Sequence, residues 1–479
     1  MTAHAQPTPQ QEAREALGPY ASYRDSGLPW LSEIPSHWDV RRNGRLFAER
    51  VETGFEDLPI LEVSLRTGVR VRDMENGARK QQMTDRSKYK RAVKGDIAYN
   101  MMRMWQGAVG VAPEDGLISP AYVVARPFPE IDPRYYTYLF RTPAYMREVN
   151  KFSRGIVADR NRLYWDEFKQ MPSAFPSTEE QTRIADFLDV HGRLTARLIR
   201  NKRRLIGLLN EQKQAIINRA VTRGLNPDTP MKPTGIDWMP EVPAHWEVKP
   251  LKHWLRERAK ALGDKTSPGY NFDYLDISCV GAGFLTAKPE RMKFKDAPSR
   301  ARQIVQKGDT ILSTVRTYLK AVYFIEDDWQ DLIASTGFAV LRPVEQVEPR
   351  LLGYVLQSST FIERVIRASI GVAYPAISEG RLGTLHVAFS LDLAEQKAIL
   401  DHITAETAAF DKAIEKAQGE ITLIREYRER LIADVVTGKL DVRHIEIAAP
   451  ADEPAIDEDD ALDEDLDAEG ADELAEAED

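Results

Sequence analysis

Residue constellations that could perform catalysis are missing from the sequence. No glycine-rich loop precedes a Lys-Ser or Lys-Thr pair that could bind a nucleotide phosphate, and Gly438-Lys439 lacks such a loop. The Asn/Asp-Pro-Pro-aromatic tetrapeptide typical of amino-methyltransferases does not occur, and neither do the HExxH and GxSxG patterns. We therefore expect no catalytic site in this chain. The loosely spaced acidic residues of a nuclease metal site remain the alternative.

Arginine, amide, hydroxyl and aromatic side chains instead cluster directly after predicted strands, around Arg103 and again around Arg316. Arginine, asparagine and glutamine can form paired hydrogen bonds to base edges, and lysine and arginine also neutralise phosphates. The sequence therefore predicts DNA contacts, with a solvated surface charge or an internal ion pair as the alternative for each residue. The predicted DNA-binding residues are Arg66, Arg70, Asn100, Arg103, Gln106, Arg160, Asn161, Arg302, Arg316, Tyr318, Lys320 and Tyr374.

Histidine and cysteine give little indication of a reactive or metal-binding site. His37 and His245 recur between a proline and a tryptophan, in motifs so rich in apolar residues that packing is the favoured interpretation over catalysis. The single cysteine, Cys279, cannot form an internal disulfide, and no cysteine-histidine cluster has zinc spacing. We expect no metal and no cofactor in this chain. The tryptophans expected to pack in the domain cores are Trp30, Trp38, Trp238 and Trp246.

The chain is an internal repeat. Residues 27–40 return as residues 235–248 with Gly, two Trp, Glu, Pro, His and Val in the same positions. The triplet Lys-Gly-Asp at 94–96, followed by Arg103, returns at 307–309, followed by Arg316. Landmarks in one order, at offsets between 208 and 216 residues, indicate a duplicated unit with small loop insertions. Each unit begins with short β-branched segments typical of strands.

Each repeat ends in a long predicted helix. Ser177-Thr-Glu-Glu180 and Asp392-Leu-Ala-Glu395 are capping boxes at equivalent places. Apolar residues then follow in steps of four and three, which is coiled-coil spacing. The first helix is basic between residues 191 and 210 and the second is acidic in the corresponding stretch, so we predict that the two helices pair with each other; pairing with another subunit first is the alternative. The predicted seam residues are Ile184, Leu188, Leu198, Leu205, Leu209 and Ile216 in the first helix, and Ile403, Phe410, Ile414, Ala417, Ile421, Ile424, Leu431 and Val435 in the second.

Charge is distributed unevenly along the 479 residues. The formal net charge is −9, but residues 451–479 contain 16 acidic and no basic residues, so residues 1–450, with 65 basic against 58 acidic residues, carry +7. A basic body is compatible with a polyanionic partner. We expect the acidic tail to be disordered and solubilising, with DNA mimicry or autoinhibition as the alternative. No secretory signal and no apolar run of about 18 residues is present, which predicts a cytoplasmic protein without membrane contact.

The repeated opening motif, the Glu-Glu-Gln and Ala-Glu-Gln helix starts, and the segment REYRERLIADVVTGKLDV at 425–442 resemble the specificity (S) subunits of type I restriction-modification systems, over about residues 26–443. The resemblance implies two DNA target-recognition domains that alternate with two antiparallel spacer helices. Each domain would bind one half of a split site on double-stranded DNA. The helices would dock two methyltransferase (M) subunits, and restriction (R) subunits would join through the complex. S-adenosylmethionine, ATP and magnesium would belong to those partners.

We therefore predict an α+β fold with two pseudo-repeated, strand-rich α/β target-recognition domains, separated by two long helices that form an antiparallel coiled coil. The predicted function is a non-catalytic specificity subunit in DNA methylation and restriction. A self-contained nuclease or methyltransferase and a DNA-independent scaffold or competitor of restriction subunits are the alternatives. The predicted segments are 1–25 (flexible), 26–176 (target-recognition domain 1), 177–225 (helix 1), 226–391 (target-recognition domain 2), 392–442 (helix 2) and 443–479 (acidic tail).

Overall fold

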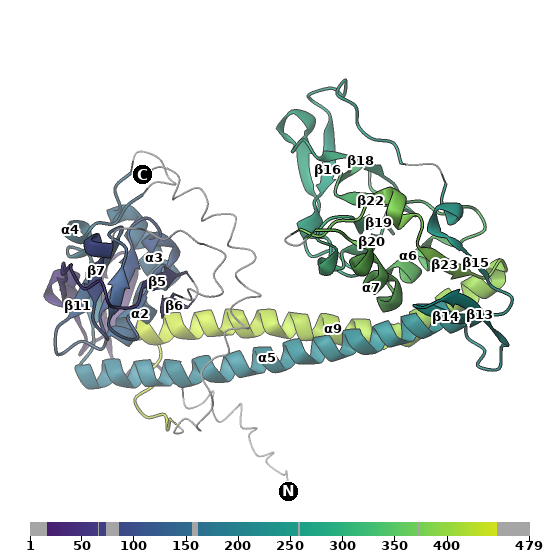
Figure 1. The fold of residues 1–479 in the computed structure, drawn as a ribbon. Helices are drawn as coiled ribbons and strands as arrows, with labels where there is room; N and C mark the ends of the chain where they lie inside the picture. Colours follow the sequence, from purple (N-terminus) through teal and green to yellow (C-terminus); the bar gives the residue numbers. More distant parts are fainter. Residues whose placement is uncertain are drawn as a thin grey trace, which may run out of the picture. The chain divides into compact units, whose positions relative to one another are not determined.

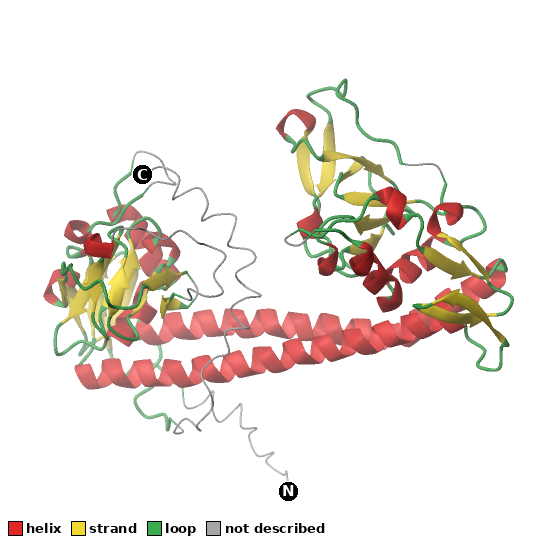
Figure 2. Ribbon diagram, viewed as in Figure 1, coloured by secondary structure: helices red, strands yellow, loops and turns green. Residues whose placement is uncertain are grey.

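The computed structural model describes residues 17–65, 67–72, 86–155, 161–256, 259–371 and 374–447. The chain forms two compact units: unit 1 contains Met1–Lys202 and Gly419–Asp479, and unit 2 contains Arg203–Gln418. Each unit combines one strand-rich domain with half of each of two long helices (Figures 1 and 2). The predicted α+β fold with two paired long helices is confirmed. The units cut across the six predicted segments, whose boundaries stay predictions.

Unit 1 is built around the antiparallel sheet β4-β11-β8-β9, with β3 paired to β12 beside it. Its described strands are β1 (Tyr23–Leu28), β2 (Leu31–Pro35), β3 (Asp39–Arg42), β4 (Phe47–Glu49), β5 (Leu61–Ser64), β6 (Gly68–Val71), β7 (Lys90–Ala92), β8 (Ile97–Asn100), β9 (Val109–Val111), β10 (Gly116–Ile118), β11 (Tyr122–Pro127) and β12 (Pro172–Phe175). Its described helices are α2 (Pro133–Phe140), α3 (Pro143–Phe152), α4 (Trp165–Phe168) and the first part of α5 (Thr178–Arg223).

Unit 2 repeats this plan and adds a second sheet. The strand β19 lies between β20 and β22, as β8 lies between β9 and β11, while β17-β16-β21-β18 form the added sheet, in which β16 and β21 are parallel. The described strands are β13 (Met231–Ile236), β14 (Met239–Pro243), β15 (Glu247–Pro250), β16 (Asn271–Leu275), β17 (Glu290–Lys293), β18 (Ala301–Val305), β19 (Thr310–Ser313), β20 (Val322–Phe324), β21 (Leu332–Ser335), β22 (Phe338–Leu341) and β23 (His386–Phe389). The described helices are α6 (Pro349–Gln357), α7 (Ser359–Ala368), α8 (Glu379–Leu382) and α9 (Leu393–Val436), whose end belongs to unit 1.

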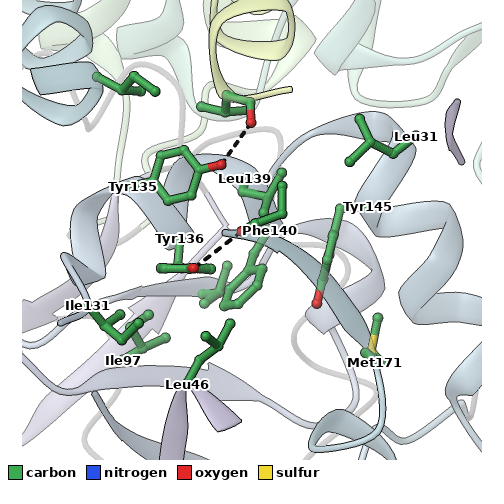
Figure 3. Packing of buried hydrophobic residues seen from close by; sticks show 14 of the residues in the cluster. Leu31, Leu46, Ile97, Ile131, Tyr135, Tyr136, Leu139, Phe140, Tyr145 and Met171 are labelled. Carbon is green, nitrogen blue, oxygen red and sulfur yellow. Dashed lines mark hydrogen bonds between the residues drawn. The ribbon is translucent and has the colours of Figure 1, made fainter. Parts of the chain in front are cut away.

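Aromatic side chains of α2 and α3 form the core of unit 1 (Figure 3). Tyr135, Tyr136 and Tyr145 are fully buried. Because a buried hydroxyl needs a hydrogen-bond partner, the hydroxyls also fix neighbouring backbone: Tyr135 donates to the carbonyl of Val436 at 3.0 Å and Tyr136 to that of Ala174 at 3.2 Å. The core therefore holds the end of α9 and the strand before α5 together.

The two ends of the described chain meet in unit 1. The amide of Asp441 donates to the carbonyl of Gly18 at 2.8 Å, and the repeat offsets align both residues with Asn226 of unit 2, where the chain is continuous. Tyr20 is buried and Ile445 packs on the same core. Residues 17–25, expected to be flexible, and residues 443–447, the start of the expected disordered tail, are thus folded because their apolar side chains complete this core. The rest of the tail lies outside the described residues.

The aspartate of the repeated Lys-Gly-Asp triplet is structural in both units. Asp96 and Asp309 are almost fully buried, and each pairs with an arginine. Asp96 binds Nε of Arg50 at 2.6 Å, whereas Asp309 receives hydrogen bonds from Nε and Nη2 of Arg342 at 2.7 and 2.8 Å. The hydrogen bonds that Arg342 donates to the Asp309 carboxylate raise the pKa of Arg342 above its usual value, which keeps the pair charged. The two arginines come from different places in the shared plan, since Arg50 follows β4 whereas Arg342 follows β22.

A carboxylate, buried in Glu180 and half-buried in Glu395, connects the first turn of each long helix to the opening motif of its unit. Glu180 Oε2 lies 2.9 Å from His37 Nε2, and Glu395 Oε2 lies 2.8 Å from His245 Nε2. The favoured interpretation of both histidines as structural residues agrees with these contacts. The predicted capping boxes are half wrong. Ser177 and the aspartate before α9 accept hydrogen bonds from backbone amides of the first helical turn, as predicted. The glutamates, however, bind the histidine of the opening motif, which lies within hydrogen-bond distance.

The glutamine that follows each of these glutamates is fully buried and fixes a second segment. Gln181 accepts from the amide of Asp132, before α2, and Gln396 accepts from the amide of Glu348, before α6, at 2.9 and 2.8 Å. Both side-chain amides also donate to backbone carbonyls. The repeated Glu-Gln pair therefore orients the helix against two parts of its own unit.

The seam between α5 and α9 is confirmed for α9 and partly wrong for α5. Within each unit the helix halves lie antiparallel, side by side (Figure 1). The predicted α9 residues are buried or half-buried, but Leu198 and Leu205 of α5 are 49% and 42% exposed. Buried Thr195 and the half-buried Lys202 and Lys213 face the partner helix instead. Such polar seam positions were missed because only apolar residues were counted.

The predicted charge complementarity of the two helices is present at two sites. Lys202 pairs with Glu420 in unit 1 and Lys213 with Asp411 in unit 2, each at 2.5 Å. The lysine stems can cover apolar surface while their ammonium groups reach the carboxylates. Both helices are amphipathic, and among the described helices none has the length and apolar character to pass through a bilayer.

We predict that Asp309→Asn destabilises the protein by about 3 kcal/mol, because it leaves the Arg342 guanidinium without its buried counter-charge. Urea unfolding followed by circular dichroism measures the change. Asp328→Asn, at an exposed position, is the control and should leave the midpoint unchanged. Equal midpoints for the two variants would show that the buried pair contributes nothing.

We also predict a pH dependence that originates at Glu395. Burial alone would raise the pKa of Glu395, but hydrogen bonds from Ser390, Trp246 and His245 outweigh it and hold the pKa below its usual value of 4.5. A lowered folded pKa stabilises the protein above the unfolded pKa, and this contribution disappears as the pH falls through the folded pKa.

Glu395→Gln should therefore lose about 1 kcal/mol at pH 7 and should lose less additional stability than the wild type between about pH 5 and pH 3. Urea titrations at several pH values measure both effects. Glu406→Gln, on an exposed position of α9, is the control. Parallel pH profiles for the wild type and Glu395→Gln would contradict the assignment.

Candidate nucleic-acid interface

Equivalent loops follow the middle strand of each unit. In unit 1 the loop 101–107 joins β8 to β9, and in unit 2 the loop 314–320 joins β19 to β20. The amide of Leu163 donates to the Met101 carbonyl at 2.9 Å, and the amide of Ile377 donates to the Thr314 carbonyl at 2.8 Å. Each loop is thus fixed from the same side, by the segment that follows α3 or α7. The repeated Arg103 and Arg316 lie in these loops.

The unit 1 loop is closed and largely covered. Met104 is fully buried, and the indole of Trp105 donates to the Met102 carbonyl at 2.9 Å. The side-chain oxygen of Asn100 accepts from the amide of Met102, so Asn100 shapes the turn. Gly107 ends it with a φ of 91°, a conformation that favours glycine. Of the predicted residues here, Arg103 is half-buried and Gln106 is exposed.

Two other predicted residues of unit 1, Arg70 and Asn161, lie near this loop. Arg70 is on β6, which lies beside β9, and its Nε pairs with Glu62 at 2.7 Å. Asn161 donates to the side chain of Asn150 on α3 at 2.7 Å. Arg66 and Arg160 were also predicted but lie outside the described residues. A ligand at the surface would have to compete with Glu62 for the side chain of Arg70 and with Asn150 for that of Asn161.

The unit 2 loop is open by comparison. Arg316 and Lys320 adopt φ values of 49° and 55°, in the left-handed region, on either side of the short 3-10 turn Thr317–Leu319. Thr317 is buried and its hydroxyl lies 2.8 Å from that of Ser369. All other residues from 316 to 320 are exposed. The loop therefore presents its side chains outward from an anchored centre.

The structure brings four predicted residues of unit 2 together and separates a fifth. The guanidinium carbon of Arg316 lies 5.0 Å from the ring centre of Tyr374, next to the loop that carries Tyr318 and Lys320. Within the described residues no carboxylate is within ion-pair distance of Arg316. Arg302 is on β18 of the added sheet, where its guanidinium covers the Phe294 ring at 4.7 Å.

Sequence reasoning missed two apolar members of the same surface, Leu319 and Ile370. Both are exposed, at 46% and 71%. Ile370 pairs with Ala376, which also bridges to Val315 at the base of the loop. An apolar residue in a sequence is usually assigned to a core, so its exposure could not be predicted. Only the neighbouring polar and aromatic residues pointed to this loop.

Metal chemistry has no recognisable site in the described parts of the chain, where no group of three or more histidine, cysteine, aspartate or glutamate side chains could hold an ion. Cys279 is half-buried in unit 2.

A second surface lies on the long helices. Leu194 and Leu198 in unit 1 and Leu205 and Leu208 in unit 2 are exposed, with spacings that place them on one face of α5. On α9 of unit 1, Leu423 and Tyr427 are exposed as well; Leu423 is the repeat equivalent of Leu208. Exposed apolar stripes on otherwise polar helices mark protein-binding surfaces.

Comparison with known proteins connects these features to one family. No family model matches the sequence. The chain is 30% identical over 113 residues to the HindI specificity subunit of a type I restriction enzyme from Haemophilus influenzae, a match that covers 23% of this chain. The matched segment thus spans only about a quarter (24%) of the length of that curated relative.

Solved structures extend the likeness to the fold. A chain from a study of complex assembly and conformational transition in a type I restriction-modification system is 14% identical, with a TM-score of 0.55, over 84% of this chain and 98% of its own length. The HsdS subunit of Thermoanaerobacter tengcongensis is 17% identical over 85% of this chain and 98% of its own length, with a TM-score of 0.38. The predicted resemblance is confirmed: this chain is similar in sequence, over one segment, to a specificity subunit of a type I restriction enzyme, and in fold, over most of its length, to a chain of a type I restriction-modification system.

Proposed function

We propose that this chain is the non-catalytic specificity subunit of a type I restriction-modification complex, in which each unit binds one half of a bipartite site on double-stranded DNA. One observation carries the proposal: the two units present loops 101–107 and 314–320 from the same place in a shared framework, but with different exposed side chains. Two copies of one framework with different contact residues suit two half-sites of different sequence.

The proposed contacts differ in how directly the structure supports them. Arg316, Tyr318, Lys320 and Tyr374 are exposed together, which favours base and phosphate contacts in unit 2. In unit 1, Asn100 ends β8, Arg103 and Gln106 lie in the equivalent loop, and Arg70 and Asn161 lie beside it. Arg302, Arg66 and Arg160 stay predictions.

Methyltransferase subunits would bind the exposed leucines of the long helices. We propose that two M subunits dock there, that R subunits join through them, and that S-adenosylmethionine, ATP and magnesium belong to these partners in the cytoplasm. Leu208 and Leu423 support two docking positions because they are exposed at equivalent places of the repeat.

We predict that lengthening both helices by one heptad widens the gap of the DNA site without changing its half-sites. Seven residues preserve the helix seam and add about 10 Å, or roughly three base pairs at 3.4 Å each. The insertions would be placed at equivalent exposed positions of α5 and α9, and the complex with M subunits would be used to select sites from a random duplex library.

Lengthening α5 alone is the matched control and should disrupt the seam and assembly. Altered half-sites with an unchanged gap would contradict the spacer role. If the wild-type complex enriched no sequence at all, a DNA-independent scaffold would replace the proposal.

Leu205→Glu combined with Leu208→Glu should weaken M-subunit binding at least tenfold, because charges would replace buried apolar contacts at the interface. Pull-down and calorimetric titration with purified M subunit measure the loss. Asn210→Glu adds a charge at an exposed position off the leucine face and is the control. Unchanged binding by the double variant would exclude this face of α5 as the docking surface.

A further inference from the structure

Backbone strain is concentrated in the loop of unit 2. Among the described residues, three that are not glycine have a positive φ, and two of them are Arg316 and Lys320. Side chains with a Cβ are disfavoured in this region. The equivalent of Lys320 in unit 1 is Gly107, which has the same left-handed conformation. A lysine therefore occupies a position where the shared framework favours glycine.

The surrounding structure enforces this conformation. The amides of Leu319 and Lys320 donate to the carbonyls of Arg316 and Thr317, at 2.9 and 3.1 Å, which closes the turn. The hydroxyl of Ser313 donates to the Val315 carbonyl at 2.6 Å. Strained residues that a rigid frame retains are typical of functional sites. The strain here costs stability, and within the described residues the Lys320 side chain makes no hydrogen bond or ion pair that would offset this cost.

The strained loop presents apolar groups between two cations. Tyr318 and Leu319 form the exposed centre of the turn, and Ile370 and Tyr374 are exposed beside it. We name Arg316, Tyr318, Leu319, Lys320, Ile370 and Tyr374 the tip cluster. A loop that only neutralised phosphates would need its cations but not four exposed apolar or aromatic side chains. The mixture matches a base edge flanked by phosphates.

We propose that the tip cluster determines base specificity in the half-site of unit 2, with Leu319 and Tyr318 in apolar contact with a base and Lys320 on an adjacent phosphate. The apolar contact is with the 5-methyl group of a thymine or with the face of an unstacked base. This inference rests on the proposed DNA-binding function. It also implies that the two units contact DNA differently. In the loop of unit 1, Met104 is buried and the indole of Trp105 donates a hydrogen bond to the backbone of the same loop.

Two single variants of the full-length protein, each assembled with M subunits, separate the two roles. Lys320→Gly introduces glycine, which unit 1 has at the equivalent position, Gly107, where the backbone φ is positive. Its urea midpoint should be equal to or higher than that of the wild type, while its DNA affinity should fall about tenfold and the slope of log affinity against log salt should lose about one unit. A residue with only a structural role would not combine higher stability with weaker DNA binding.

Leu319→Ala should act on specificity instead. Selection from a random duplex library should show about tenfold weaker discrimination at one or two adjacent positions of one half-site, with the other half-site and the salt slope unchanged. Replacing each thymine of the selected site by deoxyuracil identifies a methyl contact, and 2-aminopurine fluorescence identifies an unstacked base. Leu391→Ala, at an exposed position of unit 2 outside the tip cluster, is the matched control.

The inference is overturned if the wild type selects a bipartite site and both variants keep its affinity, salt slope and base preferences. In that case the proposed function stands and other residues determine the half-site. A wild-type complex that selects no sequence overturns the proposed function and this inference together.

Discussion

The arrangement of each unit depends on a carboxylate in the first turn of its long helix, which is buried in Glu180 and half-buried in Glu395. Glu180 and Glu395 lie near helix N-termini, where the helix dipole favours negative charge, and each binds the histidine of its opening motif. The following glutamines fix the segments before α2 and α6. The long helix, the opening hairpin and the strand-rich domain of each unit are therefore connected at one junction.

Much of this fold is visible in the sequence because the chain contains it twice. The repeat of the opening motif and of the Glu-Gln pair located both domains and both helices, and the seam of α9 followed from its apolar spacing. The seam of α5 did not, because Leu198 and Leu205, which were predicted for it, are exposed, while Lys202 and Lys213 pair with acidic residues of α9. The folded terminal segments were missed as well, since their few apolar residues become informative only when both ends meet.

The sequence indicated which loops to consider as a candidate site but not their conformation. The shared register of Arg103 and Arg316 placed the two residues in equivalent loops of the two units. Backbone angles cannot be read from the amino-acid composition, however. The sequence therefore did not distinguish the turn that ends in Gly107 from the strained turn that ends in Lys320. Long-range neighbours such as Ile370 were equally hidden, because their exposure depends on where α7 ends.

The buried aspartates of the two Lys-Gly-Asp triplets show one way in which the two halves of the repeat differ. Asp309 is held by Arg342, and the equivalent of Arg342 in unit 1 is Arg126, which is exposed while Arg50 holds Asp96. The same aspartate of the repeat is therefore neutralised by an arginine from a different segment in each unit. The ion pair is retained in both halves although the position of its arginine is not, so the need for a buried counter-charge constrains the fold more tightly than it constrains the sequence.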